Sequence, residues 1–203
     1  MPTVNGVAWR AVDGDAELVE LLRVGDESAF VVMIGRYQPH MLRLAEATVR
    51  SRAVAEEVTQ ETWLAVMRGV ERFEGRSSFK TWLFHILMNR ARTAANRETR
   101  AGRPDEHVED RFDIDGEWAS PPEPWADRAE DRLVAEHLAA RVQQLLAELP
   151  ENQRQVVLLR DVEGLASDDV AALVGVSDGN QRVLLHRGRA RLRQLLAAEM
   201  GRA

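Results

Sequence analysis

Apolar residues recur at helical spacing along most of the chain, in segments separated by short polar or glycine-containing stretches. The first such segment covers about 15–23, and the second begins after 25–28 and contains Pro39. We expect this proline either to kink the second helix or to lie in the first turn of a new helix. A third segment covers about 53–70, and a fourth begins after Ser77 and Ser78, either of which can cap it. No segment of useful length shows the strict alternation of a β-strand.

The helical pattern breaks at 102–129, where glycines and prolines occur among acidic residues without a helical period. Helical spacing resumes near Ala129 and ends in two segments at about 167–174 and 178–198. The sequence therefore predicts an all-α protein of two small helical domains joined by an acidic flexible linker. The predicted boundaries are an N-terminal extension at 1–12, a first domain at 13–101, the linker at 102–129 and a second domain at 130–203.

Composition excludes several classes of protein. The chain of 203 residues contains no cysteine, which excludes disulfides, thiolate metal sites and a cysteine nucleophile. The five histidines are scattered, and no glycine-rich phosphate loop follows a strand, so we expect no enzymatic activity, no metal and no cofactor. The N-terminus lacks the features of a signal peptide, and the longest apolar run, 29–34, is too short to span a membrane. We therefore expect a cytoplasmic protein without membrane insertion.

The net charge of −6 hides an uneven distribution of charge. Residues 102–149 contain 13 acidic and 5 basic residues. Residues 76–100 contain six basic residues against one acidic residue, and 182–193 contain five arginines and no acidic residue. Two basic patches separated by an acidic segment are typical of a protein that binds nucleic acid.

The segment 167–187 has the pattern of a helix-turn-helix motif. Ser167 and the two acidic residues after it mark the start of the first helix. Gly175 can adopt the left-handed conformation that ends this helix, and Ser177 can cap the next one. Short polar side chains near the start of the second helix, with arginines behind them, suit the base edges and phosphates of a major groove. The alternative is a surface helical hairpin with a solvated basic face.

Two features of the N-terminal half also suit binding surfaces, although each has a simpler explanation. Between 76 and 100, aromatic residues are interleaved with basic residues and asparagines, and unpaired DNA requires such stacking faces and cations. At helical spacing, Phe79 and Trp82 can equally be core residues. The acidic strip that includes Glu57 and Glu61 can bind a basic or helical protein partner, or can be a solvated helix face.

Three segments together resemble the extracytoplasmic-function (ECF, group IV) sigma factors of the sigma-70 family, which serve bacterial RNA polymerase. These segments are 55–63, with its acidic strip and Trp63; 73–91, from Phe73 to the basic part of the fourth helix; and 149–193, from Leu149 to the arginine-rich last helix. The similarity covers roughly 15–101 and 130–198. The order and spacing of the segments make it specific.

This resemblance implies a sigma factor that binds core RNA polymerase, recognises the −35 and −10 promoter elements and helps to open the −10 region, as in a stress response. The first domain corresponds to region 2, whose surface for the β′ clamp helices maps onto Glu56, Glu57, Gln60, Glu61 and Trp63. The −10 contacts of region 2 map onto Arg76, Ser77, Ser78, Lys80, Trp82, Asn89, Arg92, Asn96, Arg97 and Arg100, with Trp82 mainly structural. The second domain corresponds to region 4, whose −35 contacts map onto Ser177, Asn180, Gln181, Arg182, His186, Arg187 and Arg189.

The implied partners are core RNA polymerase, through the β′ clamp helices and the β flap, promoter DNA and an anti-sigma factor. The acidic linker of such proteins runs towards the active centre and RNA exit channel of the polymerase, which are basic. A solubilising tether is the simpler interpretation of the same segment.

The second helix of the motif departs from the family pattern. Gln181 stands where an apolar residue is usual, Val183 and Leu184 stand where serine and arginine are common, and Gly188 replaces a common alanine at a cost of about 1 kcal/mol. These departures leave open the −35 preference and the rotation of this helix. Two other classes fit the residues alone: a helix-turn-helix repressor or activator with a helical sensing or dimerisation domain, and a helical interaction adaptor.

Overall fold

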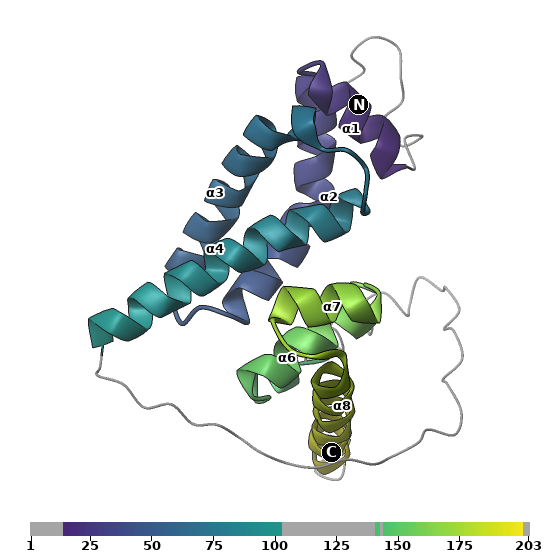
Figure 1. Cartoon of the computed structure of the whole chain (residues 1–203). Helices are drawn as coiled ribbons and strands as arrows, with labels where there is room; N and C mark the ends of the chain where they lie inside the picture. The colour runs from purple at the N-terminus through teal and green to yellow at the C-terminus, as the bar shows by residue number, and fades with distance from the viewer. Residues whose placement is uncertain (1–13, 103–140, 143, 201–203) are drawn as a thin grey trace.

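The structure is a computed structural model that describes residues 14–102, 141–142 and 144–200. All regular structure in these ranges is helical, which confirms the predicted all-α fold. Figure 1 shows the helices of the N-terminal half, α1 to α4, above those of the C-terminal half. The predicted extension at 1–12, most of the linker at 102–129 and the start of the helix near Ala129 lie outside the described residues.

The N-terminal unit contains α1 (Asp15–Arg23), α2 (Glu27–Glu46), α3 (Arg52–Gly69), the short turn η2 (Val70–Arg72) and α4 (Phe79–Gly102). Asp26 caps α2, because its Oδ1 accepts hydrogen bonds from two backbone N–H groups of the first turn, at 2.8 and 3.0 Å. The helix continues through Pro39, so the expectation of a separate helix starting there is wrong. The core of this unit lies where α2, α3 and α4 meet, as Figure 1 shows.

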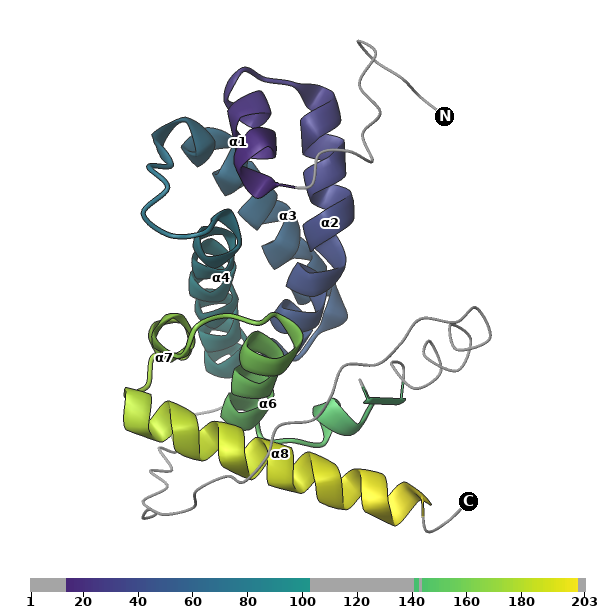
Figure 2. The same ribbon diagram turned by 90° about the vertical axis from the view of Figure 1, so that its right-hand side faces the viewer.

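The C-terminal unit contains α6 (Glu151–Val157), a turn of π-helix, η3 (Leu158–Val162), α7 (Ser167–Val174) and α8 (Asp178–Met200). Figure 2 shows α8 running along the side of α6 and α7 that faces away from the N-terminal unit. Gly175 ends α7 with φ +77°, and Ser177 Oγ accepts a hydrogen bond from the Asn180 N–H at 3.3 Å. The predicted helix-turn-helix geometry is therefore confirmed.

Gly188 allows α8 to pack closely on α6. A Cβ atom at this position would lie 2.7 Å from Val157 Cγ2 and 3.3 Å from the Gln153 carbonyl oxygen. No larger residue fits without moving one of the two helices. The helix-propensity cost of this glycine is therefore the consequence of a close helix–helix contact.

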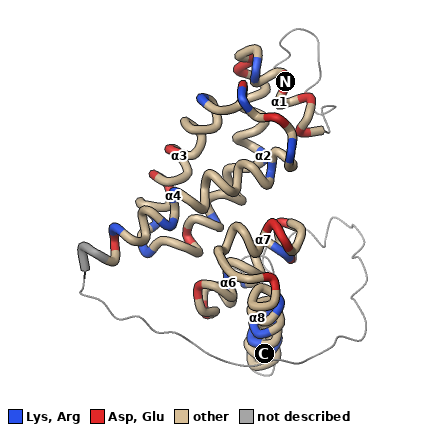
Figure 3. The backbone as a smooth tube through the Cα atoms, viewed as in Figure 1, with Lys and Arg blue, Asp and Glu red and all other residues tan. Residues whose placement is uncertain are grey.

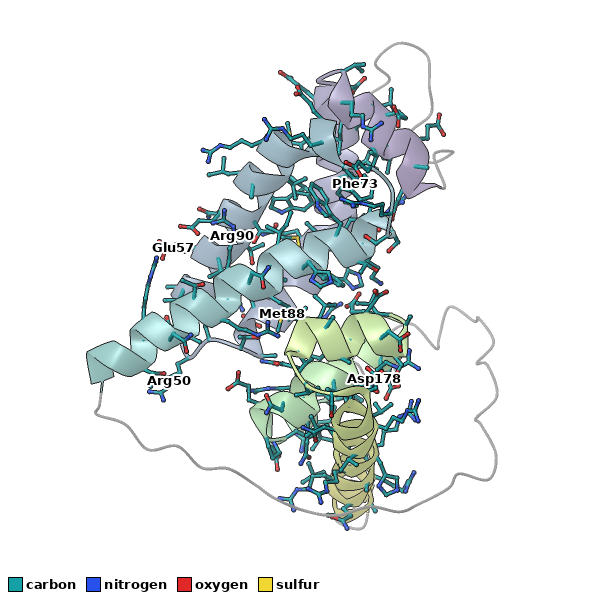
Figure 4. All side chains as sticks on the ribbon, viewed as in Figure 1. Arg50, Glu57, Phe73, Met88, Arg90 and Asp178 are labelled. Atoms are coloured by element: carbon teal, nitrogen blue, oxygen red, sulfur yellow. The ribbon has the colours of Figure 1, made fainter. Side chains whose placement is uncertain are left out.

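The two units share one continuous hydrophobic cluster, which extends from Leu18 in α1 to Val174 in α7. Polar contacts cross the same boundary: the buried Gln155 side chain donates to Thr48 Oγ1 at 3.1 Å. Figure 4 shows Met88, which contacts Thr48, on the side of α4 that faces α6 and α7. The described helices therefore form two units that are packed against each other, a feature that the sequence pattern did not predict.

Candidate functional site

The predicted polymerase-binding strip lies on the exposed side of α3. Glu56, Glu57, Gln60 and Glu61 are all exposed. Figure 4 shows Glu57 at the outer edge of this helix, near Arg90 of α4, and Arg90 forms an ion pair of 2.7 Å with Glu61. Glu56 is paired with Arg52 one turn before it. The strip is thus an accessible, acidic face of α3 that borders α4 at the Glu61–Arg90 ion pair.

Two residues of α3 have roles that the sequence pattern did not predict. Trp63 was expected at the polymerase surface, but it is 6% exposed, packs edge-on against Phe30 and donates its indole N–H to Gln38 at 2.6 Å. It is a core residue in this structure, and its predicted surface role is wrong. Leu64 is 56% exposed and lies one turn after Gln60 on the acidic face, a spacing that the sequence already contained.

The loop before α4 is held by α1 and by its own serine. Arg23 of α1 donates to the carbonyl oxygens of Val70 and Phe73, which fixes the start of the loop. Ser78 Oγ accepts from the Thr81 N–H at 3.0 Å, so Ser78 caps α4. The Arg76 side chain and Ser77 are exposed at the tip of the loop. Of the predicted −10 residues in this loop, Arg76 and Ser77 project into solvent, and Ser78 caps the start of α4.

The predicted −10 residues of α4 lie on different faces of the helix. Asn89, Asn96 and Arg97 are exposed, and two of them, Asn89 and Arg97, line a cavity of about 540 Å³ between α3 and α4. Trp82 is half-buried and packs against Phe73, with ring centroids 5.0 Å apart, which fits the mainly structural role expected of it. The Arg100 side chain lies outside the described residues.

Lys80 and Arg92 instead face the C-terminal unit. Lys80 Nζ donates to the carbonyl oxygen of Glu163 at 2.7 Å and lies 2.9 Å from its carboxylate. Arg92 is half-buried beside Gly175, at the C-terminal end of α7, and burial lowers the pKa of its guanidinium. In this arrangement neither side chain is accessible to DNA in the way that Asn89 is.

The second helix of the motif, α8, exposes most of the predicted −35 residues. Ser177, Asn180, Arg182, His186 and Arg187 are all exposed. Figure 3 shows basic positions recurring along α8 and α4, with acidic positions on α3 and at the start of α7. A helix that presents short polar side chains first and arginines behind them matches the requirements of a major groove.

Two predicted −35 residues form side-chain contacts inside the C-terminal unit. Gln181 is 0% exposed, and its Oε1 accepts a hydrogen bond of 2.8 Å from Ser167 Oγ in α7, so its predicted role in base reading is wrong. Arg189 donates two hydrogen bonds to Asp161, at 2.9 and 2.5 Å, and this pairing raises the pKa of its guanidinium. This pairing uses two of the five guanidinium N–H donors, and the Arg189 side chain stays 41% exposed.

The described residues show neither a metal site nor a membrane-spanning helix. Within the described ranges, no three His, Asp or Glu side chains are grouped so that they could hold a metal ion. None of the described helices has the length and apolar character needed to cross a membrane. The candidate functional features of the described residues are therefore the exposed surfaces of α3, α4 and α8.

Both units match one protein family. Residues 33–101 match Sigma-70 region 2, and residues 139–192 match Sigma-70, region 4. The chain is 33% identical over 179 residues to the RNA polymerase sigma-H factor of Pseudomonas aeruginosa, covering 86% of this chain and 90% of that protein. It is 31% identical over 181 residues to the ECF RNA polymerase sigma-E factor of Haemophilus influenzae, covering 86% of this chain and 91% of that protein.

Solved structures share the fold. The structure of CnrH in complex with the cytosolic domain of CnrY matches with a TM-score of 0.56 at 22% identity, covering 92% of this chain and 99% of that chain. The sigma factor RpoE in complex with the anti-sigma factor NepR from Bartonella quintana matches with a TM-score of 0.56 at 23% identity, covering 83% and 96%. Together with the two matched regions and the curated relatives, these findings confirm the resemblance seen in the sequence: the chain belongs to the ECF sigma factors of the sigma-70 family, which bind core RNA polymerase and direct promoter-specific initiation of transcription.

Proposed function

We propose that this sigma factor uses three surfaces, one for polymerase and two for promoter DNA. The acidic face of α3 binds the β′ clamp helices, and the C-terminal unit contacts the β flap. The loop before α4 and the exposed face of α4 bind and open the −10 element. The exposed face at the start of α8 binds the −35 element.

The observation that carries this proposal is the arrangement at the start of α8. Asn180 and Arg182 are exposed, whereas Gln181 between them is buried, and the close approach of Gly188 to α6 holds the helix further along. Base reading requires side chains that reach the groove from a helix whose rotation is fixed. The buried contacts support the fixed rotation, and the exposed residues supply the donors and acceptors.

The proposed polymerase surface combines acidic and apolar side chains. Glu57, Gln60 and Glu61 are exposed, and Leu64 and Met67 continue the exposed surface of α3 with apolar groups. Protein interfaces commonly have an apolar centre with a polar rim. We therefore add Leu64 and Met67 to the residues that the resemblance implied for this surface.

The proposed role of α4 is tested by DNA opening. Asn89→Ala should slow formation of the open complex more than it weakens the closed complex, because a contact to an unpaired base forms only once the strands separate. Thr99→Ala, at an exposed position two to three turns further along α4, is the matched control. Permanganate footprints of equal rate and strength for Asn89→Ala and the control would contradict this role.

Family membership does not favour the alternative of a helix-turn-helix repressor. The two differ in their need for polymerase: the proposed factor gives specific transcripts only when core enzyme is added, and the polymerase forms the phosphodiester bonds. A repressor binds duplex operator DNA without core enzyme. Run-off transcription from a genomic library with core enzyme and this chain tests the proposal directly.

We also infer that this chain works in the cytoplasm, joins the nucleoid when bound to polymerase, and is held inactive by an anti-sigma factor. RpoE from Bartonella quintana, which shares the fold, was solved with the anti-sigma factor NepR. A purified anti-sigma candidate that binds this chain should displace core polymerase from it in a binding assay. An anti-sigma role for that protein is contradicted if core binding is unchanged at saturating concentration.

A further inference from the structure

A buried acidic side chain of the C-terminal unit faces a basic cluster of the N-terminal unit. Glu163 follows the π-helical turn η3, and its side chain is 3% exposed. Its Oε1 lies 2.8 Å from His40 Nδ1 and 3.9 Å from Arg43 Nη2. Its Oε2 lies 2.9 Å from Lys80 Nζ, which forms an ion pair there but directs its hydrogen bond to the Glu163 carbonyl oxygen. Three basic side chains from α2 and α4 thus converge on one carboxylate.

The cluster contains more donors than this carboxylate satisfies. An ionised carboxylate can only accept, so His40 Nδ1 carries the proton in its 2.8 Å contact. Arg43 Nη2 therefore cannot donate to the same nitrogen, although it lies 3.0 Å away. Arg43 Nε is buried without a hydrogen-bond partner among the described residues. A basic cluster with unsatisfied donors is suited to an anion with several acceptor oxygens.

Neighbouring residues of α4 also contact acidic or electronegative groups of the C-terminal unit. Thr81 Oγ1 donates to Asp169 Oδ2 of α7 at 3.3 Å. Arg92 lies beside Gly175, where the carbonyl groups at the end of α7 carry partial negative charge. Acidic and electronegative groups of the C-terminal unit therefore cover a row of α4 residues that includes two predicted −10 contacts, Lys80 and Arg92.

We infer that His40, Arg43 and Lys80 form a binding site for a phosphate group of the promoter strand, and that the Glu163 carboxylate occupies this site in the structure. The inference extends the −10 surface to α2 and rests on the proposed function of α4. A carboxylate and a phosphate cannot occupy the same three-residue site. Strand binding at this site and packing of the C-terminal unit on α4 therefore exclude each other, and the free chain keeps part of its −10 surface covered.

Replacing the Glu163 carboxylate with a phosphate changes the electrostatic free energy little. Burial removes water from both charged partners of an ion pair, and this cost offsets most of their mutual attraction. A phosphate that replaces the carboxylate restores the same attraction, while Glu163 regains its hydration. The buried Gln155–Thr48 hydrogen bond and the shared apolar cluster are the other contacts that must be broken.

The first test measures binding of a fluorescent single-stranded DNA to the full chain without polymerase. An oligonucleotide of mixed sequence suffices, because phosphate contacts do not depend on the bases. Glu163→Gln keeps the shape of the side chain and removes its charge, and we expect it to increase affinity at least about fivefold. Asp168→Asn, which removes the charge of an exposed acidic residue in the same unit, is the matched control. Equal affinity of the wild type and Glu163→Gln overturns the inference.

The second test asks which cations hold the phosphate. In the Glu163→Gln background, Arg43→Ala should remove the gain in affinity and reduce the salt dependence by about one unit of slope. Arg36→Ala, on the same helix but paired with Asp15, should leave both unchanged. If Lys80→Ala has no effect in this background, the −10 role of Lys80 fails. If Lys80→Ala weakens binding but Glu163→Gln does not strengthen it, only the present inference fails.

The third test joins α4 to α7 with a disulfide bond. The chain has no cysteine, so Thr81→Cys with Asp169→Cys introduces a single thiol pair across the boundary between the units. Oxidation should weaken binding of the oligonucleotide at least about fivefold, and reduction should restore it. Circular dichroism in both states verifies that the helices are intact. Full binding by the cross-linked protein overturns the inference.

Discussion

The N-terminal and C-terminal units arrange functional and structural side chains differently. In α3 the exposed acidic residues form one face, and the buried residues, among them Val58 and Val66, form another. In α8 only two of the described residues, Gln181 and Gly188, are buried, and the exposed residues Asn180 and Arg182 flank Gln181. Similarly, Gly188 packs on α6 between the neighbouring arginines at 187 and 189.

This difference follows from what each helix packs against. In the N-terminal unit α3 lies between long helices, so its buried face is a broad stripe set apart from its exposed face. In the C-terminal unit α8 packs against the short helices α6 and α7 with half-buried leucines, so its buried surface is narrower. Surface changes on α3 should therefore alter binding without altering stability, whereas changes on α8 should often alter both.

The largest expected effect is at Gly188. Gly188→Leu places a side chain where even a Cβ atom would lie 2.7 Å from Val157, so we expect a loss of about 3 kcal/mol in the free energy of unfolding, together with loss of −35 binding. Urea unfolding of the full chain measures the first effect. Gly179→Ala in the same helix is the control, because a Cβ atom there meets nothing within 4 Å. Equal stability of the two variants would show that α8 is not held by this contact.

The next largest effect on stability concerns the buried hydrogen bond between Ser167 of α7 and Gln181 of α8. Ser167→Ala leaves Gln181 without its partner, so we expect a loss of about 1–3 kcal/mol in the free energy of unfolding. The double variant Ser167→Ala with Gln181→Leu removes both polar groups and should lose little relative to the wild type. A double-mutant cycle by thermal unfolding measures this coupling. Strictly additive effects would mean that the hydrogen bond has no energetic role.

A third pair of variants separates base reading from phosphate binding on the exposed face of α8. Arg182→Ala should cost about 1–3 kcal/mol at one promoter position and relax the preference there. Arg187→Ala should weaken activity evenly across promoters and lower the salt slope by about one unit. Transcription from a library randomised in the −35 element distinguishes the two outcomes. Uniform losses for both variants would assign base reading to another residue, with Asn180 the next candidate because Gln181 is buried.

The smallest effect on stability is expected on α3. Reversing Glu57 and Glu61 to Arg should weaken binding to core polymerase while changing the free energy of unfolding by no more than about 1 kcal/mol, since the Glu61–Arg90 pair is exposed. The control reverses Glu17 and Glu71, two exposed acids outside α3. Pull-down with core enzyme gives the binding result. Unchanged affinity of the α3 variant would reject the polymerase-binding role of this strip.

Several features of the fold were predictable because they depend on residues within a few turns of each other. Ser78 starts α4, Gly175 ends α7 and Ser177 caps α8, as their sequence contexts indicated. The exposed acidic face of α3 followed from helical spacing in the same way. Leu64 belongs to that face by the same rule, but an apolar residue in an amphipathic helix is ordinarily assigned to the core.

The amphipathic pattern therefore determined the helices and, with the turn residues, the helix-turn-helix. The resemblance of three segments indicated the family, and each of these features depends on short stretches of sequence. Only the tertiary structure decided that Trp63 and Gln181 are buried, and that Arg189 binds Asp161. It alone placed Glu163 against Lys80, 83 positions apart in the chain. Such contacts depend on how helices pack in three dimensions, and the local periodicity that defines a helix contains no information about which distant side chain it meets.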